Sequence, residues 1–220
     1  MQTYYFNRLP HFTPIAASYF ITIRLYDSLP QNIFLPIKET HEIELQDILK
    51  SNHTKEEKDK LTINLKEKYF SNFESQLDNK YGECYLSQPE IARCVIDKLK
   101  QYDGKYYDLY AYTIMPNHVH FLMDTAIQSN YVHDPTDKDM VTGYKSLPEI
   151  MNLIKGGTAR ECNRLLNRKG TFWASAYYDR TIRDERHWKN TVNYIVNNPI
   201  KAGITSSPEE HEFTWVKVED

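Results

Sequence analysis

Residues 105–124 have the sequence KYYDLYAYTIMPNHVHFLMD, in which a Pro116-Asn117 turn separates two runs rich in aromatic and other apolar residues. Such runs favour strands, and two strands joined by so short a turn form an antiparallel hairpin. Side chains alternate along a strand, so His118 and His120 project from one face while the apolar residues between and after them point into the core. The segment therefore predicts an antiparallel sheet with two histidines on one face.

The segments around this hairpin predict the rest of a sandwich. The expected strands are residues 17–26 and 171–182, and the expected helices are residues 89–102, 146–166 and 184–197. Ser146 and Glu149 have the spacing of a capping box at the start of the second of these helices. The order of elements predicts an α+β fold, a ferredoxin-like sandwich whose antiparallel sheet has helices on one face and leaves the other face free for a partner.

The length of 220 residues suits one domain of ordinary size, or one domain that carries an insertion. Residues 39–80 are highly charged and irregular in period, so we expect one or two exposed helices inserted there into a single domain spanning residues 1–220. Residues 125–145 predict a polar loop. The three cysteines, Cys84, Cys94 and Cys162, are widely spaced, which predicts neither a disulfide framework nor a CxxC metal site.

The composition excludes several classes of protein. With 40% hydrophobic and 26% charged residues, the chain resembles neither disordered nor fibrous sequences. No window approaches about 18 uninterrupted apolar residues, and the N-terminal segment lacks the pattern of a signal peptide, so we expect a cytoplasmic protein without a membrane helix. The net charge is −3, yet residues 141–205 carry 11 Lys and Arg against 5 Asp and Glu. A basic stretch of this kind predicts a polyanion contact, although an ordinary solvated helix face remains open.

The His118–His120 pair is a candidate metal site. Two imidazoles one strand repeat apart, on the same face of a rigid strand, can bind one ion side by side. Pairs of this spacing are common and most are incidental. The position of this pair at the start of a strand, directly after a tight proline turn, favours the metal site.

The last predicted helix has the sequence DERHWKNTVNYIVNNP. Its apolar stripe contains Trp188, Val192, Ile195 and Pro199, and Tyr194 lies off that stripe, on a line with His187, Thr191 and Asn198. Tyr194 and Asn198 are neighbours at i and i+4, so they can present a phenol and an amide oxygen to the same point. The alternative is a surface tyrosine followed by an Asn-Pro that ends the helix.

Together, the segments MPNHVHFL and YIVNNPIKAGI resemble the HUH single-tyrosine transposases of small bacterial insertion sequences, and most of all the REP-associated tyrosine transposases. Four further segments match in the order expected of that branch: PHFTPIAASYFITIRLYDSLP, LDNKYGECYL, IKGGTAR and GTFWASAYYDRTIRDE. The resemblance covers about residues 8–205 and leaves most of 39–75 unmatched. The two leading segments are specific as a pair and weak singly.

The resemblance implies a DNA transposase, a site-specific endonuclease that cleaves and rejoins single-stranded or hairpin DNA through a 5′-phosphotyrosine intermediate. It assigns the nucleophile to Tyr194, and the ligands of a divalent metal, Mg²⁺ or Mn²⁺, to His118 and His120. The expected third ligand is Asn198, although a residue before proline is biased away from helical geometry.

Two more residues have possible roles in such a site. His187 lies on the same side of the helix as Tyr194 and is an accessory candidate, as a ligand or a proton shuttle. Tyr178 is the rival nucleophile, on a predicted strand outside the matching segment.

The expected partner is single-stranded or hairpin DNA with palindromic repeats, bound by a monomer or a homodimer. The candidate DNA-binding residues are Lys155, Arg160, Arg164, Trp173, Tyr177, Arg180 and Arg183. The basic members can contact phosphates, and the two aromatic members can stack on unpaired bases, with a core position as the alternative for Trp173.

Three alternative functions remain open from the sequence. The first is a non-catalytic nucleic-acid-binding regulator on the same fold. The second is another HUH nickase, such as a replication initiator or relaxase. The third is a metal-dependent phosphoesterase that forms no covalent intermediate.

Overall fold

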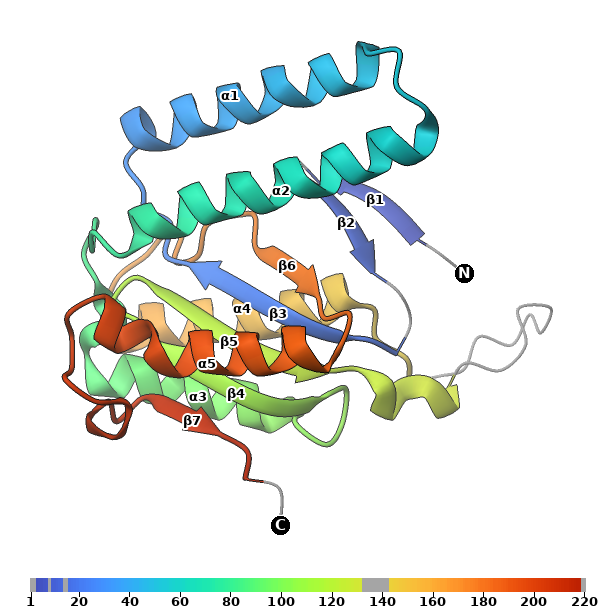
Figure 1. The fold of residues 1–220 in the computed structure, drawn as a ribbon. Coiled ribbons are helices and arrows are strands. Elements are labelled where there is room, and N and C mark those ends of the chain that lie inside the picture. Colours follow the sequence, from blue (N-terminus) through green and yellow to red (C-terminus); the bar gives the residue numbers. More distant parts are fainter. Residues whose placement is uncertain (1–2, 8, 14–15, 132–142, 219–220) are drawn as a thin grey trace. The chain divides into compact units, whose positions relative to one another are not determined.

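The predicted hairpin forms the centre of a five-stranded antiparallel sheet in a computed structural model that describes residues 3–7, 9–13, 16–131 and 143–218 (Figure 1). The order across the sheet is β6-β3-β5-β4-β7, and every neighbouring pair is antiparallel. The strands are β3 (Ser18–Arg24), β4 (Asp108–Ile114), β5 (His118–Asp124), β6 (Tyr178–Thr181) and β7 (Thr214–Val216). With the helices between them, these strands confirm the predicted α+β class.

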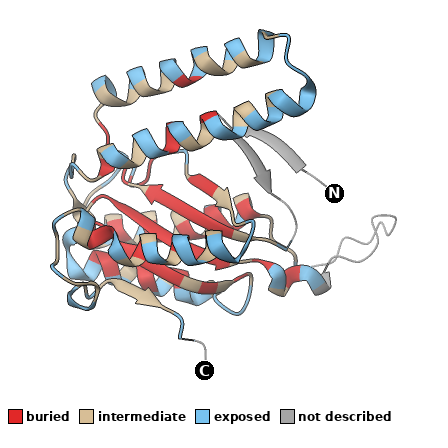
Figure 2. Cartoon of the chain, in the orientation of Figure 1, coloured by how far each residue is buried: buried red, intermediate tan, exposed pale blue. Residues whose placement is uncertain are grey.

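Two helices cover one face of the sheet, α3 (Pro89–Tyr102) and α4 (Leu147–Leu165). Their apolar sides pack with the side chains that β3 and β5 direct to that face, such as Ile21, Val119 and Phe121, all of them inaccessible to solvent. Figure 2 shows the resulting continuity of buried residues along the central strands. Burial of these side chains supplies most of the drive for folding of the sandwich.

The third helix of the sandwich, α5 (Glu185–Lys201), packs on the opposite face, which the sequence analysis leaves free for a partner. The side of the helix that faces the sheet matches the predicted stripe only in part. Ile195 and Pro199 are buried as predicted, but Thr191 and Asn198 are buried as well, whereas Trp188 and Val192 are only half-buried. The reason is that β5 turns polar histidines toward this face, so a mixed polar and apolar side of α5 packs best against it.

Helix α5 also runs through Pro199, where the sequence analysis expects it to have ended. Proline lacks a backbone N–H but tolerates helical φ, and Pro199 lies in the last turn, so only one helical hydrogen bond is missing. The N–H groups of Ala202 and Ile204 donate to the carbonyls of Asn198 and Pro199, which closes the helix end. The expectation of non-helical geometry at Asn198 is therefore wrong.

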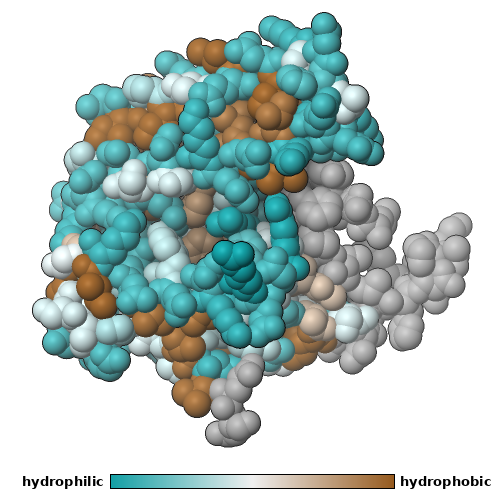
Figure 3. Space-filling model, viewed as in Figure 1, coloured by the Kyte–Doolittle hydropathy of each residue, from teal (hydrophilic) through white to brown (hydrophobic). Residues whose placement is uncertain are grey.

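Residues Asp27–Cys84 form a compact unit of their own, a hairpin of two helices, α1 (Gln31–Lys50) and α2 (Lys55–Leu77). The sequence predicts an insertion that starts at residue 39. Helix α1 begins at Gln31 and continues past Pro36, so the insertion starts earlier than predicted. Helix α2 begins at a capping box in which Glu57 accepts a hydrogen bond from the backbone N–H of Thr54. Figure 3 shows hydrophobic residues on the surface of this unit, in which Ile43 is 63% exposed.

The insertion leaves the sandwich and returns to it at a single turn. On the outgoing side, the N–H of Leu25 donates to the carbonyl of Asn117, and on the returning side the N–H of Leu86 donates to the carbonyl of Pro116. The short helix η1 (Tyr85–Ser87) then leads into α3. Two adjacent carbonyls of the β4–β5 turn therefore hold both ends of the segment that carries α1 and α2.

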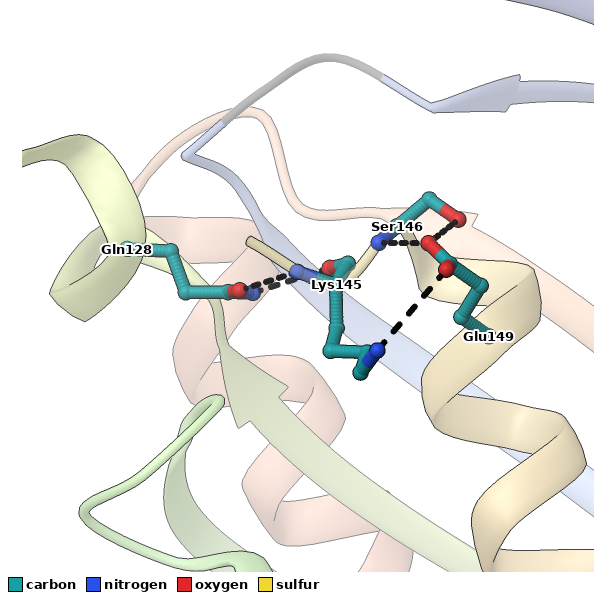
Figure 4. Close-up of polar contacts among 4 residues, drawn as sticks. All are labelled: Gln128, Lys145, Ser146 and Glu149. Carbon is teal, nitrogen blue, oxygen red and sulfur yellow. Dashed lines mark hydrogen bonds and ion pairs between the residues drawn. The ribbon is translucent and has the colours of Figure 1, made fainter. Parts of the chain in front are cut away.

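The predicted polar loop at 125–145 begins with the short helix η2 (Ala126–Tyr131), and residues 132–142 lie outside the described residues. The buried side chain of Gln128 fixes the far end of the loop by bonding to both the N–H and the carbonyl of Lys145, at 2.7 and 3.1 Å (Figure 4). Next to it, Glu149 accepts hydrogen bonds from the N–H and hydroxyl of Ser146, as the predicted capping box requires.

The remaining elements are short. A separate hairpin of β1 (Thr3–Asn7) and β2 (Leu9–Thr13) precedes the sandwich, and η3 (Pro208–Glu210) precedes β7. Strand β6 is shorter than the predicted 171–182, because residues 172–174 contact β3 through isolated bonds rather than a continuous ladder. Of the helices described, none has the length and apolar character needed to cross a membrane.

Candidate metal and tyrosine site

The sequence around the two histidines holds them rigidly. The N–H of Met115 donates to the carbonyl of His118 at 2.8 Å, which closes the Pro116-Asn117 turn at the start of β5. His120 lies in the middle of the sheet, paired with Thr22 of β3 on one side and Thr113 of β4 on the other. Both imidazoles are 1% exposed and lie on the α5 face, as the predicted alternation requires.

The two imidazoles point their Nε2 atoms at each other, 3.0 Å apart. Their other ring nitrogens have partners on the protein: His118 Nδ1–H donates to Asn117 Oδ1 at 2.7 Å, and His120 Nδ1 bonds to the hydroxyl of Thr22 at 2.8 Å. Because an amide oxygen only accepts, His118 has its proton on Nδ1 and a lone pair on Nε2. Partners of this kind orient the imidazole ligands of metal sites.

Burial makes both imidazoles neutral at physiological pH. It lowers the pKa of His118 to about 3, with a smaller effect from the positive charge of Lys201. The pKa of His120 is also well below its usual value, because of burial, then of His118 and Lys201. Neutral imidazole is the form that ligates metals. The two histidines therefore do not have to release a proton to solvent before a cation binds.

The spacing of the pair fits a divalent cation. The two Nε2 atoms, 3.0 Å apart, are close enough for both imidazoles to hold the same cation. Without a cation, the short contact requires His120 Nε2–H to donate to His118 and the Thr22 hydroxyl to donate to His120 Nδ1. For both Nε2 atoms to hold a cation, the His120 proton would have to lie on Nδ1, where the Thr22 hydroxyl can accept it.

Tyr194 lies over the pair from α5. Its ring meets His120 edge-on, with centroids 5.4 Å apart, and meets Phe20 in the same way at 5.7 Å. Phe20 in turn stacks on the ring of His120 at 5.3 Å. The phenol is half-buried, so its position is fixed while part of it stays accessible. The structure therefore brings together three of the residues that the sequence analysis selected.

Asn198 follows Tyr194 by one helical turn and is 1% exposed. Within the described chain, neither the oxygen nor the nitrogen of its amide has a hydrogen-bond partner. A buried amide without partners is costly, about 1–3 kcal/mol. Among the described residues no three His, Cys, Asp or Glu side chains form a cluster that could hold a metal ion, so a metal at the histidine pair would need a ligand of another type, such as this amide oxygen.

Four residues that orient the imidazoles, pack against the site or add a positive charge near it are not among the candidates predicted from the sequence. Asn117 and Thr22 orient the imidazoles, and Phe20 packs against His120 and Tyr194. The ammonium of Lys201 lies 5.9 Å from the centroid of the Tyr194 ring. Two signals were available in the sequence, since Asn117 precedes His118 directly and Lys201 is two helical turns after Tyr194. Thr22 and Phe20 come from a distant strand and carry no local signal.

The other two site candidates have different surroundings. His187 lies in the first turn of α5, where its Nδ1 accepts from the N–H of Arg183 and its own N–H donates to Asp184. Tyr178 is buried in β6 and pairs with Thr22, which pairs in turn with His120. Two strand spacings, about 10 Å, therefore separate the backbone of Tyr178 from that of His120.

The predicted DNA-binding residues divide into exposed and structural ones. Arg160 and Arg183 are exposed, and Arg164 is exposed but paired with Glu161 on the same helix. Lys155 donates to the carbonyl of Ser175 at 2.7 Å.

The remaining three candidates lie on or near β6. Tyr177 is half-buried, with the ammonium of Lys155 5.8 Å from the centroid of its ring. Arg180 is half-buried on β6 and pairs with Phe20. Trp173 is buried in the core, 4% exposed, with its ring N–H donating to Thr158, so it is not available to stack on a base.

An open groove of about 690 Å³ runs along the flank of α5 beside β4 and β7. Tyr110 and Trp188 meet edge-to-face in it, with ring centroids 4.6 Å apart, and Lys189 and Lys217 also line it. The lysines pair with Glu185 and Asp108 respectively, at 2.6 and 3.9 Å. Exposed ion pairs of this kind are weak and exchange partners readily.

No protein-family model matches the chain, and a search of curated proteins finds no match either. A comparison with solved structures finds a REP-associated tyrosine transposase bound to a REP hairpin. That likeness has a TM-score of 0.49 and 12% sequence identity, and it covers 95% of this chain and 82% of that one. At this identity the activity of that protein is not transferred to this chain.

Proposed function

We propose that this chain is a metal-dependent DNA strand transferase of the HUH type, with Tyr194 as its nucleophile. The observation that carries the proposal is the placement of a half-buried phenol edge-on against a pair of neutral imidazoles whose Nε2 atoms face each other. The resemblance of MPNHVHFL and YIVNNPIKAGI to the single-tyrosine transposases supports the same assignment.

In the proposed step, the oxygen of Tyr194 forms a bond to a backbone phosphorus of DNA and the bond from phosphorus to O3′ breaks. The phenol loses its proton, the released 3′-oxygen gains one, and the DNA stays attached as a 5′-phosphotyrosine. Because one phosphodiester is exchanged for another rather than hydrolysed, its bond energy is conserved, and a second 3′-hydroxyl can reverse the reaction and rejoin strands. Phe20 and His120 hold the phenol ring, and Lys201 places a positive charge beside it.

His118, His120 and Asn198 would hold the divalent cation, Mg²⁺ or Mn²⁺. When bound, it polarises the scissile phosphate as a Lewis acid. Two nitrogen ligands and one amide oxygen suit Mn²⁺ better than Mg²⁺ on ligand softness. Asn117 and Thr22 keep the two imidazoles turned toward the ion, which limits the reorganisation that binding requires.

The proposed substrate is a DNA hairpin with an adjacent single strand. Phosphates would contact exposed basic residues of the 141–205 stretch, such as Arg160 and Arg183. Trp173 is buried, so it cannot stack on unpaired bases. Bases would stack instead in the groove beside α5, where Tyr110 and Trp188 are only half-buried. Lys189 and Lys217 can exchange their carboxylate partners for phosphates of the same strand.

The test is Tyr194→Phe, which removes only the attacking oxygen. With a hairpin substrate and Mn²⁺, the wild-type protein should give a covalent protein–DNA adduct on a denaturing gel, and the variant should lose both adduct and cleavage while keeping its fold. Tyr178→Phe is the matched control and should keep both. An adduct that persists in Tyr194→Phe, or that maps to Tyr178, would overturn the assignment. Cleavage without any adduct in the wild type would favour a hydrolytic phosphoesterase, and binding without cleavage a regulator.

A further inference from the structure

The fold brings two of the three widely spaced cysteines together on the face of the sheet opposite the histidines. Cys94 on α3 and Cys162 on α4 are 68 positions apart in the sequence, and their sulfur atoms are 3.6 Å apart. Cys162 is fully buried, whereas Cys94 is half-buried at the edge of the helix pair. One thiol is therefore open to small reagents, and its partner is shielded behind it.

Near this pair, a glycine of α4 lies against the side chain of a lysine of α3. A Cβ atom at Gly157 would lie 2.9 Å from Cε of Lys98, so the lysine stem occupies the space that a side chain would fill. Along α3 the contact runs from Cys94 to Lys98, and along α4 from Cys162 back to Gly157, so the helices are antiparallel. The sulfur atoms face each other on this tightly packed seam.

The two thiols are chemically unequal. The hydrogen bond from Cys162 lowers the pKa of Cys94, against the opposing effects of burial and of the nearby carboxylates Glu161 and Asp97. Donation of that hydrogen bond and burial both raise the pKa of Cys162. Cys94 is thus the thiol that ionises, and Cys162 is its hydrogen-bond donor. A partly accessible thiol that accepts a hydrogen bond from a shielded second thiol is the arrangement found in peroxide-reactive cysteine pairs.

We propose that Cys94 and Cys162 form a redox modification site, in which a hydroperoxide oxidises Cys94 and the two residues then join in a reversible disulfide between α3 and α4. In the first step, the Cys94 thiolate attacks a peroxide oxygen, the O–O bond breaks, and sulfenic acid forms with release of water or an alcohol. In the second, the Cys162 sulfur displaces hydroxide from the sulfenic acid, and its proton leaves in the water formed. The sulfur atoms close from 3.6 Å to about 2.0 Å.

Cys84 provides an internal comparison. It lies in the unit Asp27–Cys84, where its thiol donates to the carbonyl of Lys80. Burial and the negative charge of Asp27 raise its pKa, so it ionises less readily than Cys94. In the described structure its sulfur contacts only backbone carbonyls rather than another sulfur.

The experiment treats the reduced full-length chain with hydrogen peroxide near equimolar amounts and follows intact mass and peptide maps. The expected product has lost two hydrogen atoms, joins the peptides of Cys94 and Cys162, and reverts with dithiothreitol. Its thermal midpoint should be higher than that of the reduced protein, because the bond closes a long loop in the unfolded chain. Cys94→Ser and Cys162→Ser should lose this product, and Cys84→Ser should keep it.

Three outcomes would overturn the proposal. These are oxidation of Cys84 before Cys94, accumulation of sulfinic acid at Cys94 without the disulfide, and a peroxide-treated wild type that keeps three free thiols. The peptide map of the wild-type protein decides among them even if a serine variant fails to fold. A Cys94→Ser variant that folds should also show Cys162 resistant to peroxide.

Discussion

Asn198 buries a carboxamide whose two polar atoms have no partner within the described chain. Such a group lowers the free energy of unfolding, so replacing it with an apolar residue of similar volume should stabilise the metal-free protein. We predict that Asn198→Leu raises the free energy of unfolding by about 1–3 kcal/mol in the presence of a chelator. Denaturant titration with EDTA measures this change. The same variant should bind Mn²⁺ more weakly by calorimetry, because it lacks the proposed third ligand.

His118→Ala and His120→Ala should lose Mn²⁺ binding outright, whereas His53→Ala, at an exposed position in the helical hairpin, should retain it. If Asn198→Leu bound Mn²⁺ as tightly as the wild type, Asn198 would not be a ligand. If it also destabilised the fold, the amide would have a partner in solution that explains its burial without any metal.

The two buried imidazoles also predict how stability depends on pH. Their pKa values in the folded state are far below the value of about 6.5 expected in the unfolded chain, with that of His118 at about 3. Between these limits the unfolded state binds more protons, so the free energy of unfolding rises with pH. Their contribution is complete above about pH 6.5 and is lost progressively as the pH falls toward 3.

We therefore expect the thermal midpoint of the metal-free protein to fall between about pH 6.5 and pH 5, before most carboxylates titrate. A double variant, His118→Gln with His120→Gln, should show a shallower dependence over the same range, because glutamine does not titrate. Calorimetric scans at constant ionic strength make the comparison. Parallel curves for the two proteins would show that the imidazoles are solvated in solution.

Among the helices, α4 depends on the cap at its first turn. Glu149 accepts two hydrogen bonds from Ser146, at 2.8 Å from the N–H and 2.6 Å from the hydroxyl. We predict that Ser146→Ala lowers the free energy of unfolding by about 1 kcal/mol, as loss of a helix N-cap commonly does. Ser146→Thr, which keeps the hydroxyl that donates to Glu149, should retain most of the stability. A Ser146→Ala variant as stable as the wild type would indicate that Gln128, rather than the cap, fixes the start of α4.

Elements with a strong local pattern were predictable from the sequence. Helix α3 and strand β5 have the predicted bounds, because Pro89 sets the start of α3 and the Pro116-Asn117 turn sets the start of β5. Helices α1 and α5 were predicted too short, because each continues through a proline that ends most helices. Tertiary packing decides such cases, since burial of Asn198 and Pro199 against the sheet keeps the last turn of α5 helical.

The candidate site was predictable in part for the same reason. His118 and His120 lie in one compact motif, and strand alternation alone predicts that both share one face of the sheet. Tyr194 lies in a second motif, but helical periodicity puts it off the expected buried stripe, whereas α5 brings its ring against His120. Thr22 meets His120 only through strand pairing across 98 positions, and Cys94 meets Cys162 only through helix packing, so neither contact has a local signal. Trp173 shows the converse, since an aromatic residue in a basic stretch looks the same in sequence whether it stacks on DNA or fills a core.

At the scale of the whole molecule, the proposed DNA interface predicts a steep dependence of affinity on salt. Removing one basic side chain that binds a phosphate should reduce the slope of log affinity against log salt by about 1. Arg160→Ala and Arg183→Ala should show this reduction, and Lys105→Ala, exposed in the turn after α3, should not. Fluorescence anisotropy over a salt series measures the slopes. Unchanged slopes in both arginine variants would remove these residues from the interface.

The groove beside α5 predicts a preference for single strands. A hairpin with a single-stranded flank should bind better than blunt duplex of equal length at matched salt, because only the flank can stack on Tyr110 and Trp188. Trp188→Ala should weaken binding of the flanked hairpin by about 1–3 kcal/mol and leave the duplex unchanged. Equal binding of the two DNAs by the wild type would contradict this mode of recognition.

The joint at which the helical hairpin enters and leaves the sandwich has a use in protein engineering. Its two anchors, Leu25 and Leu86, hydrogen-bond to neighbouring carbonyls, so the ends of any replacement segment would start close together. The entropy cost of closing a loop between such ends grows only slowly with the length of the loop. A foreign ligand-binding domain could therefore be spliced between these residues. The anchoring carbonyls belong to the turn at the start of β5, the strand that carries both histidines. A grafted domain that changes conformation on ligand binding would therefore act on that turn. The joint is thus a suitable insertion site for a ligand-controlled version of this protein.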